Sequence, residues 1–357
     1  SGQTALCIIV SGGGIFYLMK KILSLFLILV LMLSLSSCDT TNAQPIDSLP
    51  KVVMVASEGG LGDESFNDMA YEGILKAAKD YRIEVTIEEP EDRYAYIETV
   101  SAVAGEADLV IAVGYIDANT LQEIAENNPD TYFAVVDSQV QVADNVMILS
   151  FKEEEGSFIV GIIAALTTET QILGFVGGAE DGTIESFEFG YRAGIKAINP
   201  EARVLVEYTG CFDNAEHGKA AALSLIEEGA DVVFHAAGEC GIGVIEAAGE
   251  KGVWAIGVDK DQSDLNPDAV LCSMFKRVDH GVHLAIQSFM EGKFEGAVYE
   301  FGLDFEAVGY SDAAGNLSNE VKSLADLYAK AIIAGDIYVP KNREEFEEFK
   351  VPEEGLI

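Results

Sequence analysis

Basic residues are scarce in this sequence of 357 residues, which contains 22 Lys and Arg against 60 Asp and Glu and carries a net charge of −38. A nucleic-acid-binding surface needs clustered basic side chains to neutralise phosphates, so this composition excludes nucleic acid as a partner. The negative electrostatic potential of such a chain also disfavours strongly anionic ligands unless a local basic group attracts them. Most of the acidic side chains are expected to be solvated at the surface.

Catalytic motifs are also missing. The sequence has neither a GxSxG nucleophile elbow nor a GxxxxGK[ST] phosphate loop, and it has only four histidines. The glycine-rich run GECGIG at Gly238–Gly243 does not have the order of a GxGxxG motif. No group of residues has zinc-ligand spacing. The sequence therefore predicts a protein that is not an enzyme and that uses no cofactor and no metal.

Cysteine is sparse, with five residues and no CxxC pair. Cys211, Cys240 and Cys272 are expected to be small buried hydrophobic residues. At most one disulfide is possible among these three, and none is predicted.

No apolar run near the N-terminus is long enough to span a bilayer. The run Ile22–Leu35 has about 14 residues, short of the roughly 20 that a spanning helix needs. It follows the basic start Met19-Lys20-Lys21 and precedes Ser36-Ser37-Cys38, which is the pattern of a secretory signal with a lipidation site at Cys38. The alternative is an ordinary signal peptide with an incidental cysteine.

These features define four N-terminal expectations. Residues 1–18 are a non-native or misassigned upstream segment, residues 19–37 are a lipoprotein signal peptide, Cys38 carries lipid, and residues 38–50 form a polar tether.

From residue 52 onward, short apolar runs alternate with helical patterns, which predicts a doubly wound α/β fold with parallel sheets. The expected strands are 52–56, 84–87, 109–113, 133–136, 172–176, 204–208, 232–235 and 253–258. The expected helices are 67–80, 94–104, 118–127, 185–198, 215–228, 241–251, 279–291 and 319–334.

The pattern starts again near residue 172, so two lobes facing each other across a ligand cleft are predicted. The N-terminal lobe is expected to contain residues 51–151 and 270–296. The C-terminal lobe is expected to contain residues 152–269 and 297–335, followed by a loosely structured tail at 336–357.

Ligands of open α/β sheets bind at the carboxyl ends of strands, so the segments after each strand contain the candidate residues. Phe66 and Phe212 follow strands in different lobes and can stack on a planar base, although either ring could simply anchor a helix start. Asp137 and Asp259 can accept hydrogen bonds from ligand hydroxyls or N–H groups, or can serve as turn residues. Lys276 either donates to ligand oxygens or neutralises a cleft aspartate, unless it is a surface lysine.

Four segments, in order, resemble the basic membrane protein (BMP) family of lipoproteins. Gly59–Asn67 (GGLGDESFN) resembles the family segment GGIDDKSFN, and further similarity is found at Glu155–Gly161, Gly257–Gln262 and Ser273–Asp279. The resemblance covers the chain from about Val52 to Gly309. Members of this family are substrate-binding components of ABC transporters, and some bind purine nucleosides.

The resemblance implies a type I periplasmic-binding-protein fold and a defined set of ligand contacts. Phe66 and Phe212 would sandwich the purine, Asn67 and Asp137 would contact the base, Asp259 and Lys276 would bind the ribose hydroxyls, and Gly238 would lend a backbone contact. Ser57 occupies a position where nucleoside-binding members often have an acidic residue, so the base preference stays open.

The function implied is that of an extracytoplasmic, lipid-anchored receptor in the cell membrane, facing the periplasm or the outside. It would bind inosine, guanosine or adenosine as a monomer and deliver the nucleoside to ABC permease and ATPase subunits. The alternatives are a membrane-tethered sensor that binds a sugar or another small ligand and a nucleoside-cleaving enzyme.

Overall fold

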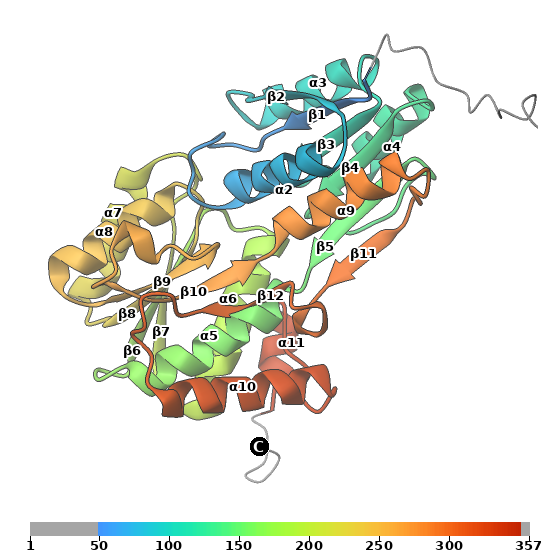
Figure 1. Cartoon of the computed structure of the whole chain (residues 1–357). Coiled ribbons are helices and arrows are strands. Elements are labelled where there is room, and N and C mark those ends of the chain that lie inside the picture. Colours follow the sequence, from blue (N-terminus) through green and yellow to red (C-terminus); the bar gives the residue numbers. More distant parts are fainter. Residues whose placement is uncertain (1–48, 351–357) are drawn as a thin grey trace, which may run out of the picture. The chain divides into compact units, whose positions relative to one another are not determined.

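The computed structural model describes residues 49–350 and folds them into two six-stranded sheets (Figure 1). The doubly wound α/β architecture predicted from the sequence is confirmed. The expected upstream segment, the signal peptide and Cys38 lie outside the described residues.

The first lobe is built on an all-parallel sheet with the strand order β11-β5-β4-β3-β1-β2. Its strands are β1 (Lys51–Val55), β2 (Glu84–Glu88), β3 (Leu109–Val113), β4 (Tyr132–Val136), β5 (Val146–Phe151) and β11 (Val298–Phe301). Helices α2 (Phe66–Asp80) and α9 (Val278–Met290) lie side by side on one face (Figure 1). Helices α3 (Arg93–Ala104) and α4 (Ala118–Asn127) contribute to the separate apolar core of the other face.

The second lobe has the strand order β12-β10-β9-β8-β6-β7, and only β12 runs antiparallel to its neighbour. Its strands are β6 (Ile172–Gly177), β7 (Arg203–Tyr208), β8 (Val232–Ala236), β9 (Trp254–Asp259), β10 (Val270–Lys276) and β12 (Val308–Ser311). Its helices are α5 (Glu153–Thr167), α6 (Gly182–Ile198), α7 (Ala215–Glu227), α8 (Cys240–Lys251), α10 (Asn319–Ile333) and α11 (Arg343–Glu348), with short 3-10 turns at Ser263–Leu265 and Leu303–Phe305.

Burial on both faces explains why the strands are continuous apolar runs. All five residues of β3 (LVIAV) and of β8 (VVFHA) are buried, as expected for central strands of parallel sheets covered on both sides. Aspartates begin three of the helices: Asp92, Asp117 and Asp181 each accept two backbone N–H bonds in the first turn of α3, α4 and α6. Part of the acidic excess therefore serves as helix caps.

The chain crosses between the lobes three times, at Lys152, Arg277 and Gly302. Backbone hydrogen bonds join these segments to their neighbours, from Lys152 N to Phe301 O (2.9 Å) and from Arg277 N to Ala307 O (2.7 Å). The crossovers therefore form a compact hinge region.

The positions of the second and third crossovers differ from the sequence-based lobe boundaries. Residues 270–276 form β10, which pairs with β9 and β12 in the second sheet, whereas they were expected in the N-terminal lobe. Residues 298–301 form β11, which pairs with β5 in the first sheet, whereas they were expected in the C-terminal lobe. Strand pairing decides these placements, including the pairing of β11 with β5 across about 150 residues of sequence, and a linear pattern does not contain that information.

The C-terminal segment is more ordered than the expected tail. Ile337 and Val339 are buried, and the ring of Phe346 in α11 packs 5.7 Å from that of Phe189 in α6. Residues 336–350 therefore belong to the second lobe.

Candidate functional site

Lys276, the last residue of β10, is the centre of a buried charged cluster at the junction of the lobes. Its side chain is 1% exposed, which contradicts the reading of this residue as a surface lysine. Its Nζ lies 2.7 Å from Oδ2 of Asp137 in the first lobe and 2.7 Å from Oε1 of Glu153 in the second. Burial alone lowers the pKa of Lys276, but the neighbouring carboxylates overcome this effect and raise it above its usual range.

Three phenylalanine rings surround the same amine. The ring centroids of Phe66, Phe151 and Phe187 lie 5.1, 5.3 and 5.6 Å from Lys276 Nζ, within the range of cation–π attraction. Phe66 is the first residue of α2, and Phe151 ends β5, so the rings come from elements far apart in sequence. This cage restricts water around the amine and fixes its position.

Asp137 follows β4 and adopts a left-handed backbone conformation with φ of 62°. Its Oδ2 accepts the hydrogen bond from Lys276, whereas its Oδ1 is buried and has no hydrogen-bond partner within residues 49–350. Burial raises the pKa of Asp137, and Lys276 opposes this shift. An unpaired buried acceptor is costly, so Oδ1 is suited to a donor group of a ligand.

Glu153 is a site residue that the sequence analysis missed. It is the first residue of α5, it is 5% exposed, and burial raises its pKa to about 7 against the opposing effect of Lys276. The available signal was the triplet Glu153-Glu154-Glu155 directly before an apolar run, which is typical of a buried helix start.

Asp259 ends β9 and also has a left-handed backbone, with φ of 65°. Its Oδ2 accepts a hydrogen bond from the hydroxyl of Ser65 in the first lobe. Burial raises its pKa to about 6, and the nearby charge of Lys276 partly offsets this effect. The carboxylates bonded to Lys276 are thus Asp137 and Glu153, whereas Asp259 feels its charge at longer range, so the expectation that Lys276 neutralises a cleft aspartate holds for Asp137.

Asn67 and Ser57 form a second group with mainly internal bonds. Oδ1 of Asn67 accepts hydrogen bonds from the backbone N (2.9 Å) and the hydroxyl (3.1 Å) of Ser57, and its Nδ2 donates to Asp63. Since an amide nitrogen carries two hydrogens, one remains for another acceptor. Asn67 therefore ties the end of β1 to the start of α2, which limits it to one further contact.

Phe212 and Gly238 lie together at the carboxyl ends of β7 and β8. The carbonyl of Phe212 accepts a hydrogen bond from Glu239 N (2.9 Å), and Gly238 has a φ of 54°. A Cβ at Gly178 would lie only 2.1 Å from Cε1 of Phe212, so the ring rests directly on this glycine. The absence of a side chain at residue 178 thus sets where the Phe212 ring lies.

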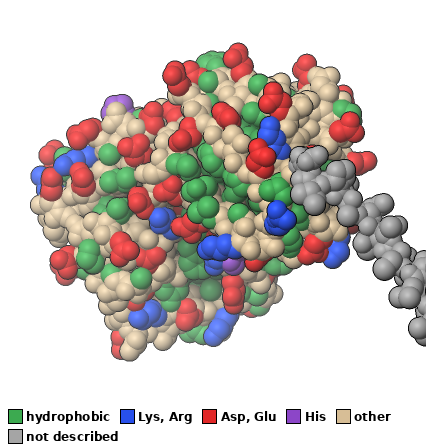
Figure 2. Space-filling view, turned by 45° about the horizontal axis from the view of Figure 1, so that its top comes forward, with side chains coloured by type: hydrophobic (Ala, Val, Ile, Leu, Met, Phe, Trp, Pro, Cys, Tyr) green, Lys and Arg blue, Asp and Glu red, His purple; other side chains and the backbone are tan. Residues whose placement is uncertain are grey.

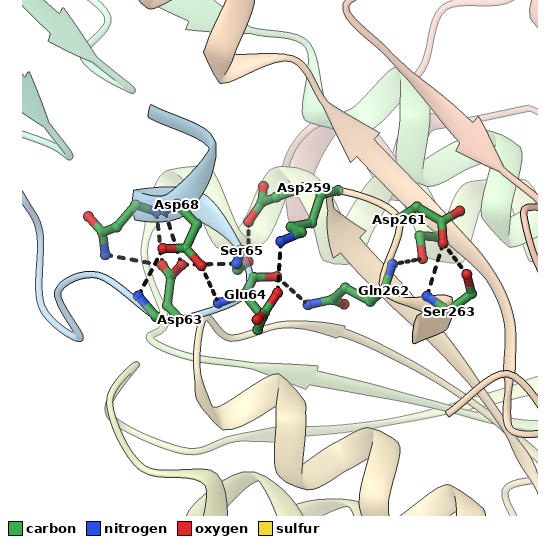
Figure 3. A network of polar contacts seen from close by, with 12 residues as sticks. Asp63, Glu64, Ser65, Asp68, Asp259, Asp261, Gln262 and Ser263 are labelled. Carbon is green, nitrogen blue, oxygen red and sulfur yellow. Dashed lines mark hydrogen bonds and ion pairs between the residues drawn. The ribbon is translucent and has the colours of Figure 1, made fainter. Parts of the chain in front are cut away.

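Loops of the two lobes also contact each other next to Asp259 (Figure 3). Lys260 Nζ lies 2.7 Å from Glu64 Oε2, and Gln262 Nε2 donates to the Glu64 carbonyl (2.9 Å). Together with the bond between Ser65 and Asp259, these contacts hold the Asp63–Asp68 segment against the residues that follow β9.

The structure joins some predicted residues by direct contact and leaves others apart. Phe66, Asp137 and Lys276 meet in one cluster, and Asp259 lies within electrostatic range of it. Ser57 and Asn67 form one pair, and Phe212 and Gly238 form another. The lobes approach each other near Phe212, because a Cβ at Gly59 would lie 3.5 Å from its carbonyl oxygen.

Charge at the surface follows the composition. Figure 2 shows acidic side chains spread over one face of the molecule, with fewer Lys and Arg among them. Among the helices of residues 49–350, none is sufficiently long and apolar to cross a membrane.

Comparison with known proteins places these features in context. Residues 50–343 match the family model described as ABC transporter substrate-binding protein, PnrA-like. The chain is 37% identical over 317 residues to the CD4+ T-cell-stimulating antigen of Listeria innocua, covering 81% of this chain and 88% of that protein. It is 32% identical over 341 residues to basic membrane protein A of Borreliella burgdorferi, covering 93% of this chain and 98% of that protein.

Among solved structures, an ABC transporter solute-binding protein from Aeropyrum pernix is similar, with a TM-score of 0.77 and 27% identity. The similarity covers 84% of this chain and 96% of that one.

Proposed function

The chain belongs to the PnrA-like family of ABC transporter substrate-binding proteins, and from this premise we propose that it binds a purine nucleoside such as inosine, guanosine or adenosine for uptake. Proteins of this family bind substrates outside the cytoplasm and deliver them to transporter subunits, and they are not enzymes.

The observation that carries the proposal is the unpartnered Oδ1 of Asp137, beside Lys276 in the buried cluster. This atom is buried and unpartnered within the described residues, while the other carboxylate oxygen is fixed by Lys276. A nucleoside is uncharged and offers N–H donors on a flat base and O–H donors on its ribose. One such donor would satisfy Asp137 without introducing a charge.

Electrostatics support an uncharged ligand. The only cationic group of the cluster, Lys276, is already paired with Asp137 and Glu153, and Asp259 lies close by. An anionic ligand would meet these carboxylates without a free cation among them to compensate. A neutral molecule avoids this cost.

The aromatic residues supply apolar faces for the base. Phe66 is held by the Lys276 amine and Phe212 by Gly178, so both rings have defined positions. Stacking of a base on an aromatic ring contributes about 1–3 kcal/mol. In this proposal the lobes close around the base, as two-lobed receptors do around their ligands.

The proposal includes a membrane anchor. Cleavage before Cys38 and its acylation would attach the receptor to the membrane through the tether at 38–50, and a monomer would present the ligand to ABC permease and ATPase subunits.

Isothermal titration of the purified protein with inosine, guanosine, adenosine and uridine tests this function. We expect heat and a thermal shift with at least one purine nucleoside and a weaker response to uridine. Absence of both signals with all four would refute nucleoside binding. Heat with a sugar and none with nucleosides would favour the sensor alternative.

A further inference from the structure

Two cysteines lie within reach of each other beside the Phe212 loop. Cys211 Sγ is 3.7 Å from Cys240 Sγ, and Cys240 Sγ also lies 3.4 Å from the carbonyl oxygen of Cys211. Both residues are free thiols, 29 positions apart in the sequence. A disulfide requires the sulfurs to approach to about 2.05 Å, so the two side chains must rotate to close the remaining gap.

The backbone around the pair is already in place. Cys211 lies on the loop after β7, Cys240 is the first residue of α8, and the bond from Glu239 N to Phe212 O (2.9 Å) connects the residues between them. Joining the sulfurs would therefore reinforce an existing contact.

The two thiols differ in exposure, so Cys211 can react with an external oxidant before Cys240 does. Cys240 is fully buried, whereas Cys211 is partly exposed, contrary to the expectation that all three cysteines would be buried. Cys211 Sγ also lies 3.2 Å from Nδ1 of His217, which can accept the thiol proton in the tautomer that leaves this nitrogen unprotonated. Burial and the contact with Cys240 raise the pKa of Cys211 to about 11, so a nearby proton acceptor would assist reaction at neutral pH.

We propose that Cys211 and Cys240 are a redox site that forms a reversible intramolecular disulfide with a disulfide-bearing oxidant, such as glutathione disulfide or a thiol–disulfide oxidoreductase. The partly exposed Cys211 sulfur attacks the oxidant, forming a mixed disulfide and releasing the first oxidant thiol, which takes the Cys211 proton by way of His217. The Cys240 sulfur then attacks Cys211 Sγ and releases the second oxidant thiol, which takes the Cys240 proton. Two protein thiols are oxidised, and one external disulfide is reduced to two thiols.

An oxidising compartment is where such a bond persists, and the family works outside the cytoplasm. The disulfide would fix the loop bearing Phe212 to the start of α8, and thus control the mobility of one wall of the candidate site. This last consequence rests on the proposed function, whereas formation of the bond does not.

Oxidation of the purified, folded protein with glutathione disulfide tests the proposal, with peptide mass mapping as the readout. We expect loss of two hydrogens in a cross-linked peptide pair containing residues 211 and 240, reversed by dithiothreitol. The matched control Cys272→Ser removes the buried third thiol and should leave the cross-link unchanged. Cys240→Ser should instead retain glutathione on Cys211.

A second readout is thermal stability without any nucleoside. Closing a loop of this length should raise the melting temperature by roughly 5 °C in the wild type and in Cys272→Ser, and not in Cys211→Ser or Cys240→Ser. Thiols that stay unlinked in the folded wild type, or a stable glutathione adduct on Cys211 with Cys240 present, would overturn the proposal. Neither readout depends on nucleoside binding, so the two proposals fail separately.

Discussion

The amine of Lys276 lies 2.7 Å from Oδ2 of Asp137, and this ion pair joins the end of β10 in the second lobe to the end of β4 in the first. The same amine binds Glu153, which begins α5 directly after a crossover. One side chain thus links the two lobes and the hinge, and it lies against the candidate ligand contacts.

Replacing Lys276 with methionine should be strongly destabilising. The change leaves the buried carboxyl groups of Asp137 and Glu153 without their cation, and breaking a buried pair in this way costs about 3–5 kcal/mol. Urea unfolding of wild type and variant measures the difference. Lys293→Met, at an exposed pair with Glu291, is the control and should change stability little. Equal effects of the two substitutions would contradict the role assigned to the buried cluster.

Asp137→Asn should weaken nucleoside binding. The variant has a single carbonyl oxygen, which Lys276 occupies, so an amide NH2 donor replaces Oδ1 and cannot accept from the ligand. We therefore expect an affinity about 10–100-fold lower. Titration calorimetry gives the affinity, and a thermal melt confirms that the variant is folded. Asp268→Asn, an exposed aspartate outside the site, serves as the control. An unchanged affinity in Asp137→Asn would remove Oδ1 as a ligand contact.

Stability should rise as the pH falls from 8 to 5. Burial raises the pKa of Asp259 from its ordinary value of 3.8 to about 6 in the folded protein. At a pH between these two pKa values, the carboxyl group is more protonated in the folded state than in the unfolded state. Deprotonation of the buried carboxyl at higher pH therefore costs stability, by roughly 1 kcal/mol between pH 5 and pH 8 for this group alone. Glu153, with a pKa of about 7, acts in the same direction.

Urea unfolding at several pH values measures this dependence. In Asp259→Asn the slope should become shallower, because the group that titrates is gone. If the unfolding free energy of the variant changed with pH as steeply as that of the wild type, titratable groups other than Asp259 would control the pH dependence. The pKa of Asp279, lowered to about 2 by Arg277 and Lys76 against the effect of burial, predicts a separate loss of stability only at more acidic pH.

Gly178→Ala should displace the Phe212 ring. The added Cβ would lie 2.1 Å from Cε1 of this ring, so the ring must move from its present position. If Phe212 stacks on the base, affinity should fall by about tenfold or more, as stacking contributes 1–3 kcal/mol. Gly182→Ala is the matched control, since a Cβ there meets no atom within 4 Å. Calorimetry on both variants compares their affinities for the nucleoside. A lower affinity in Gly178→Ala alone would be caused by displacement of the Phe212 ring and not by any Gly-to-Ala change.

Most elements of the fold were predictable from sequence because parallel strands buried on both faces leave clear apolar runs. The strand at 109–113 and the helix at 118–127 were predicted with their observed bounds. Helix α5 was missed, since ten of its fifteen residues are buried and it therefore lacks an amphipathic period. The missing helix also hid Glu153.

The candidate site was predictable as a set of strand-end residues, but not as a network of partners. Position at or just after the end of a strand identified Asp137, Asp259 and Lys276, because the carboxyl ends of parallel strands lie at one edge of their sheet. The pairing of Lys276 with Asp137 depends on how the lobes approach each other. That distance is set by packing at the crossovers, which no local pattern encodes.

The three crossovers have a consequence for how the receptor moves. The backbone connects the lobes at three crossovers, and hydrogen bonds near Lys152 and Arg277 hold these segments to their neighbours. These connections restrict how one lobe can rotate relative to the other. A receptor joined by a single flexible linker would sample many orientations, and a ligand would have to select one of them at an entropic penalty. Here the crossovers limit the orientations that a ligand has to select, so a larger share of the contact energy remains available for affinity.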